Sequence, residues 1–136
     1  MKKFTNNFRI LLAGVIASTL MGFPAQAVNL SDKDKQFLIG YEKIHAALAA
    51  DDLSAAKSAA KELSGEGADI AEAVSLKDAR ASFEKLSKRA LGLVAGQSGY
   101  YVVHCPMLKK EWVQTSTTIA NPYAGKEMAT CGEIKK

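Results

Sequence analysis

The chain has 136 residues and a formal net charge of +4, and 48% of its residues are hydrophobic. This length fits a single small domain with a modest core. The basic residues form no cluster that could follow a phosphate backbone, so we expect no nucleic-acid partner.

Residues 1–27 have the pattern of a secretory signal peptide. Two lysines follow Met1, an apolar run covers 10–23, and Ala25-Gln26-Ala27 has the small residues of a cleavage site. A membrane-spanning helix needs about 20 apolar residues, and this run is stopped earlier by Pro24. We therefore expect cleavage after Ala27, export to the periplasm, and no membrane span in the mature chain 28–136.

Cleavage would also change the charge. Lys2, Lys3 and Arg9 would leave with the signal peptide, and the mature chain would keep 15 basic and 14 acidic residues. The high isoelectric point is then mainly a property of the targeting segment.

The first helical pattern begins at Ser31, which with Asp34 resembles a capping box. Apolar residues then recur at steps of four, three and four, which defines one face of a helix. These residues are Phe37, Tyr41, Ile44 and Leu48. We expect His45, on the same helix, to lie at the surface or at its boundary.

Two further helices are predicted before residue 100. Asp51-Asp52 can cap an alanine-rich helix that runs to Leu63 and ends in the glycine-containing stretch 64–67. After a short helical turn at 68–74, Ser75 opens the longest amphipathic pattern, which continues to Leu93. Short loops between antiparallel helices are typical of a small up-and-down bundle.

The character of the chain changes after Gly99. The run 100–105 is aromatic and β-branched, 111–119 is a second extended stretch, and 121–125 has the residues of a turn. We therefore predict one mainly α domain over 28–136. It consists of an antiparallel bundle of three to four helices (28–99) and a C-terminal Cys/Met-containing lobe of short strands or irregular structure (100–136).

The lobe contains all the sulfur of the predicted mature chain. The four sulfur-containing residues are Cys105, Met107, Met128 and Cys131. Two cysteines in an exported chain favour a disulfide, which would stabilise the lobe by about 3 kcal/mol through loop closure. Thiolate, thioether and imidazole groups are also the donors that select Cu(I). The sequence allows a disulfide, a metal site, or a disulfide that clamps the remaining donors together.

The candidate metal ligands are therefore the sulfur-containing residues of the lobe and one histidine, with the single tryptophan as a cation–π wall. They are His104, Cys105, Met107, Met128 and Cys131, with Trp112 as the wall. The alternative for the methionines is core packing. We find no Ser/His/Asp arrangement, no paired carboxylates, no phosphate-binding glycine loop and no Cys-x-x-Cys motif, so we predict that the protein is not an enzyme.

The stretches YYVVHCPM (100–107), EWVQT (111–115) and NPYAGKEMATCG (121–132) resemble the signature of an uncharacterised periplasmic domain family. Members occur alone or fused to the C-terminus of adaptor (membrane-fusion) subunits of copper/silver efflux pumps. The resemblance covers most of the mature chain, including the third helical pattern at 79–87. It departs at Ala124, where the family more often has an aromatic residue.

The resemblance implies a heavy-metal context, with an efflux adaptor or another periplasmic protein as the partner. Our leading prediction is thus a periplasmic domain that binds Cu(I) or Ag(I) and serves copper tolerance or efflux. The alternative is a disulfide-stapled interaction module that binds no metal. Both depend on residues near 105 and near 130 meeting in space.

Overall fold

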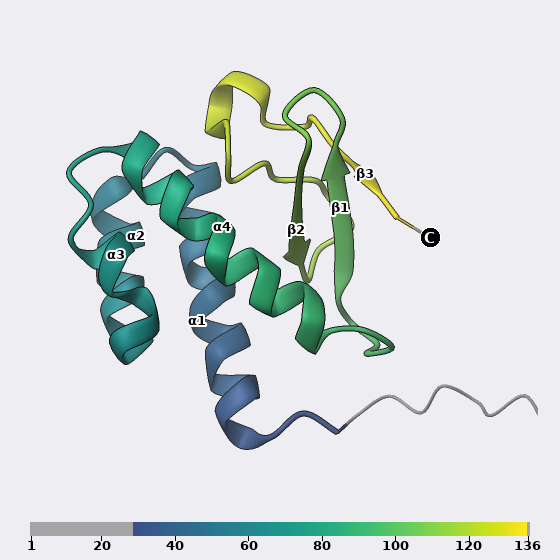
Figure 1. Cartoon of the computed structure of the whole chain (residues 1–136). Helices are drawn as coiled ribbons and strands as arrows, with labels where there is room; N and C mark the ends of the chain where they lie inside the picture. Colours follow the sequence, from purple (N-terminus) through teal and green to yellow (C-terminus); the bar gives the residue numbers. More distant parts are fainter. Residues whose placement is uncertain (1–28, 136) are drawn as a thin grey trace, which may run out of the picture.

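The computed structural model describes residues 29–135, so the predicted signal peptide lies outside the described part of the chain. Figure 1 shows helices on one side of the molecule and a small sheet on the other. The helices are α1 (Asp32–Ala49), α2 (Leu53–Glu62), α3 (Ala68–Ala71) and α4 (Leu76–Leu93), with 3-10 turns η1 (Ser64–Gly67) and η2 (Gly125–Met128). The strands are β1 (Tyr101–Cys105), β2 (Lys110–Gln114) and β3 (Glu133–Ile134).

The three long helices begin where the capping residues predict. The amide of Asp34 donates to Ser31 Oγ (3.2 Å), and that of Asp78 donates to Ser75 Oγ (3.1 Å). Asp52 caps α2 in the same way, since its carboxylate accepts from the amide of Ala55 at 2.8 Å. Among residues 29–135, no helix is long and apolar enough to cross a membrane.

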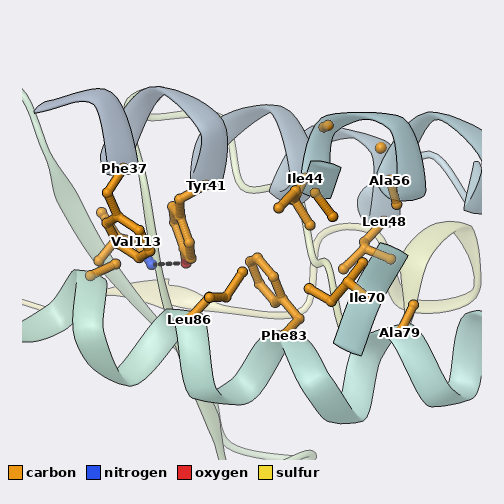
Figure 2. Packing of buried hydrophobic residues seen from close by; sticks show 14 of the residues in the cluster. Phe37, Tyr41, Ile44, Leu48, Ala56, Ile70, Ala79, Phe83, Leu86 and Val113 are labelled. Atoms are coloured by element: carbon orange, nitrogen blue, oxygen red, sulfur yellow. Dashed lines mark hydrogen bonds between the residues drawn. The ribbon is translucent and has the colours of Figure 1, made fainter. Parts of the chain in front are cut away.

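The main core lies between α1 and α4. Figure 2 shows the predicted apolar face of α1 pointing toward Phe83 and Leu86 of α4. Tyr41 and Phe83 stack with ring centroids 5.0 Å apart, and both are buried. The alanines of α2 allow close packing at the other end of α1, where Ala56 and Ala60 are fully buried.

The predicted fold class, a mainly α bundle with an appended lobe, is wrong. The C-terminal part contains an antiparallel three-stranded sheet in the order β2-β1-β3, and this sheet is built into the helical core. Val113 of β2 is buried in the same cluster as Phe37 and Leu86, and Val102 of β1 packs against it. The fold is therefore helices packed on a sheet, with one core shared between 29–99 and 100–135.

Tyr41 explains why the sheet joins the helices. In the order β2-β1-β3, strand β2 has a free edge, and the amide of Val113 on it donates to Tyr41 Oη at 3.0 Å (Figure 2). Covering an edge strand in this way satisfies backbone groups that would otherwise be unpaired in a buried place. The sequence pattern identified Tyr41 as a core residue but not this polar contact.

Two polar side chains fix the segment that follows β2 onto the helices. His45 is 3% exposed and its Nε2 lies 2.8 Å from the carbonyl oxygen of Ala120, so the prediction of a surface or boundary position is wrong. Arg80 of α4 donates to the carbonyl of Pro122 (2.9 Å), the carbonyl of Leu48 (3.0 Å) and Asp51 Oδ1 (2.5 Å). These bonds hold the start of the C-terminal loop against α1 and α4.

Candidate functional site

The two cysteines of the lobe are joined. Cys105 at the end of β1 and Cys131 between η2 and β3 form a disulfide with Cα atoms 5.5 Å apart, and neither cysteine is free. The prediction of a disulfide is confirmed. The two sulfur-containing segments therefore meet, as both functional hypotheses require.

A second buried cluster surrounds this disulfide. Val103, Cys105 and Trp112 have no exposed surface, and Met128 and Cys131 pack against them while remaining partly exposed. We call Cys105, Met128 and Cys131 the sulfur cluster. Tyr123 packs on both this cluster and the main core, with its ring 5.7 Å from that of Phe83 and 6.2 Å from that of Trp112. Burial raises the pKa of Tyr123 to about 12.

Trp112 supports the sulfur cluster from the protein interior. Its side chain is fully buried, and its Nε1–H donates to Gln114 Oε1 at 3.0 Å. Its ring and that of Tyr123 meet in a T-shaped arrangement, with an interplanar angle of 62°. An indole enclosed in this way presents no open face to a cation arriving from solvent. The geometry thus favours a packing role for Trp112 over the predicted cation–π wall.

His104 lies apart from the sulfur cluster. Successive residues of a strand point to opposite faces, and Cys105 is in the sulfur cluster while Val102, two residues before His104, packs on the main core. His104 therefore shares the face of Val102. On that face its Nδ1 lies 3.5 Å from Glu111 Oε1 of β2, its partner in the strand register.

Met107 is also separate. It is 76% exposed in the turn between β1 and β2, and it does not belong to the cluster around the disulfide. The structure thus divides the predicted ligand set into three parts. Three sulfur-containing residues lie together, one thioether stands in solvent, and the imidazole is on the opposite face of the sheet.

Asn121 was predicted only as part of the turn at 121–125, but its side chain also bonds to the backbone of Cys131. Asn121 has no exposed surface, and its Oδ1 accepts from the amides of Tyr123 (2.9 Å) and Ala124 (3.2 Å). Its Nδ2 donates to the carbonyl of Cys131 at 3.3 Å. The Asn-Pro pair signals the turn, but nothing in the sequence indicates the bond to residue 131.

Charged pairs border the hairpin that carries the site. Lys110 of β2 pairs with Glu84 of α4. The ammonium of Lys110, and to a smaller extent that of Lys88, holds the pKa of Glu84 below its usual value. Lys135 pairs with Glu111 across the sheet. Within the described residues, no group of three or more His, Cys, Asp or Glu side chains could hold a metal ion.

The donor types of the sulfur cluster fit a soft monovalent metal only in one redox form. Thiolates and thioethers select Cu(I), but a disulfide supplies no thiolate. In the disulfide form the cluster offers the Met128 thioether, and after reduction it would also offer two thiols. Comparison with protein-family models, curated proteins and solved structures finds no match for this chain.

Proposed function

We propose that the protein is an exported domain that binds Cu(I) or Ag(I) through its sulfur cluster and serves copper tolerance or efflux. The observation that carries the proposal is the convergence of Cys105, Cys131 and Met128 from two distant segments. The signal-peptide pattern of residues 1–27 supports export to the periplasm. The resemblance of 100–132 to domains fused to efflux adaptors supports such an adaptor as the partner.

The donors in the cluster match the preference of these metals. Sulfur ligands bind Cu(I) and the chemically similar Ag(I) in preference to hard cations, which prefer oxygen. Met128 is partly exposed, so a metal ion can reach the cluster from solvent at that side. His104 and Met107 lie outside the cluster and are not needed for this proposal.

The direct test is a titration of the mature chain, 28–136, with Cu(I) in competition with bicinchoninate. The protein is measured both as the disulfide and after reduction, and silver is tested by displacement. We expect one Cu(I) per chain in at least one redox form. A chain that leaves all copper with the chelator in both forms contradicts the proposal.

The state of the cysteines and of Trp112 also favours a second function, a disulfide-stapled interaction module. Both cysteines are bonded and Trp112 is enclosed, as expected of a staple that fixes a surface for another periplasmic protein. This interaction module predicts that Cu(I) and Ag(I) leave the thermal midpoint unchanged. A metal ion that binds the native state but not the unfolded chain raises the thermal midpoint. One melting experiment with and without metal therefore separates the two functions.

A further inference from the structure

The loop that carries Cys131 is held in place by bonds other than the disulfide. Before the cysteine, the amide of Asn121 donates to the carbonyl of Ala129 at 3.0 Å, and the amide of Cys131 donates to the carbonyl of Met128 at 3.0 Å. After it, β3 pairs with β1, and the amide of Lys135 donates to the carbonyl of Val102 at 2.9 Å. Hydrogen bonds therefore anchor the chain on both sides of Cys131.

The side chain of Asn121 connects this loop to the preceding turn. Because Oδ1 faces the amides of Tyr123 and Ala124, the Nδ2 group is left to face the carbonyl of Cys131. Asn121 is fully buried, so water does not compete for these bonds. One side chain thus fixes the turn and the position of the cysteine together.

Close packing of Gly132 also holds the loop on the sheet. A Cβ atom added to Gly132 would come within 2.6 Å of Val103 Cγ1 and 3.0 Å of the Trp112 ring. The backbone next to Cys131 therefore lies directly on the buried face of the sheet. This contact, like the hydrogen bonds, does not depend on the covalent link between the sulfurs.

We infer that Cys105 and Cys131 form a reversible dithiol–disulfide centre in which Asn121 is the positioning residue. When the disulfide is reduced, the loop stays on the sheet and the two thiols stay adjacent. With Met128 they then present a site of two thiolates and one thioether for Cu(I). The metal step rests on the proposed function, whereas the positioning by Asn121 does not.

The reduction requires a dithiol reductant and proceeds by thiol–disulfide exchange. A reductant thiolate attacks Sγ of Cys131, because that residue is partly exposed and Cys105 is not. A bond forms between the reductant sulfur and Sγ of Cys131, the Cys105–Cys131 bond breaks, and Cys105 leaves as a thiolate that takes a proton. The second reductant thiol then displaces Cys131, so the protein gains two electrons and two protons and the reductant leaves as a disulfide.

Binding of the metal to the reduced centre involves no further electron transfer. Each thiol that ligates Cu(I) gives up its proton to solvent, and the metal stays monovalent. Exchange with a disulfide oxidant, the reverse of the reduction above, would rejoin Cys105 and Cys131 and remove both thiolates. The metal would then be held by Met128 alone and released.

The first test measures the positioning without metal. In Asn121→Asp the carboxylate still accepts from the amides of Tyr123 and Ala124, but it cannot donate to the carbonyl of Cys131. We expect the equilibrium constant for forming the disulfide from the reduced chain, measured against glutathione, to fall about fivefold, because a reduced loop that lacks this hydrogen bond holds the two thiols next to each other for less of the time. Tyr41→Phe, which loses bonds in the main core and none to a residue of the sulfur cluster, serves as the control and should leave the constant unchanged.

An unchanged constant in Asn121→Asp would overturn the assignment. Hydrogen exchange of the wild-type reduced chain tests the same point without a variant. The amides of Asn121 and Lys135 should stay protected after reduction, since their bonds to Ala129 and Val102 persist. Loss of that protection would show that the loop leaves the sheet when the disulfide opens.

The second test adds Cu(I) as its bicinchoninate complex. We expect the reduced chain to bind at least ten times more tightly than the disulfide form, and Met128→Leu to weaken the reduced site about tenfold. Met107→Leu is the matched control, because Met107 is exposed and outside the cluster. Equal affinity in both redox forms would overturn the dithiol site while leaving metal binding intact. Absence of binding in both forms, with a changed constant in Asn121→Asp, would overturn the metal step and keep the positioning.

Discussion

Removing one oxygen atom from Tyr41 should measure how strongly the sheet is tied to the helices. In Tyr41→Phe the ring keeps its stacking on Phe83, but the amide of Val113 loses its acceptor and Ser87 Oγ, 3.1 Å away, loses its contact. Val113 is 1% exposed, so water cannot replace the missing partner. A buried donor left without a partner costs about 1–3 kcal/mol, and we expect a loss of about 2 kcal/mol in the free energy of unfolding.

The single tryptophan provides the assay. Trp112 is fully buried in the native state, so its fluorescence changes when urea unfolds the domain. A loss of about 2 kcal/mol would lower the thermal midpoint by roughly 8 °C for a domain of this size. The control is Tyr101→Phe, because this residue is partly exposed and belongs to neither buried cluster. A loss below about 0.5 kcal/mol in Tyr41→Phe would be smaller than the cost of an unpaired buried donor. It would refute the claim that the bond from Val113 to Tyr41 ties the sheet to the helices.

The same variant should change the alkaline limit of stability. Burial raises the pKa of Tyr41 above its ordinary value of 10.0, so the native state keeps the proton that the unfolded chain releases. The stability from this group is complete below pH 10 and declines as the pH rises beyond it. We therefore expect Tyr41→Phe to lose stability less steeply than the wild type above that pH.

Three further variants test the loop and its anchors. Replacing both cysteines with alanine should lower the free energy of unfolding by about 3 kcal/mol in urea melts, because the loop they close spans 26 positions; an unchanged free energy of unfolding would contradict this. Gly125→Ala should cost about 2 kcal/mol, since φ is +56° and the new Cβ would lie 1.8 Å from Asp51 Oδ1, whereas Gly92→Ala meets open space. Asp51→Asn should lower the thermal midpoint at pH 7, and the difference from the wild type should disappear in acid. Arg80 holds the pKa of Asp51 below its ordinary value, so the stabilisation is present above that value and is lost as the pH falls; a difference that persists in acid would show that charge is not its cause.

The helices were predictable because their signals are local. Ser31, Asp52 and Ser75 each cap the helix that follows, and the steps of three and four in 37–48 fix the buried face of α1. Capping and periodicity depend on residues within one or two turns of each other. Such signals survive in any tertiary context that buries the apolar face.

The sheet was not predictable in the same way. Strand β3 has two residues, one of them charged, and only its pairing with Val103 and His104 makes it a strand. The bond from Val113 to Tyr41 spans 72 positions, and that from His45 to residue 120 spans 75. Neither polar contact leaves a pattern in the sequence, which is why Tyr41 was interpreted as apolar core and His45 as surface.

Cys105 and Cys131, 26 positions apart in the chain, meet as predicted, whereas His104, the neighbour of Cys105, does not lie with them. Cys105 and Cys131 were expected to meet because an exported pair of cysteines favours a disulfide, and this chemistry holds whatever the fold between them. His104 was grouped with Cys105 because the two are adjacent in the chain. In a strand, adjacent side chains point to opposite faces, so His104 points away from the sulfur cluster that contains Cys105. The alternation of side chains along 100–105 would have removed His104 from the predicted ligand set, whereas the solvent position of Met107 follows only from the turn after Cys105.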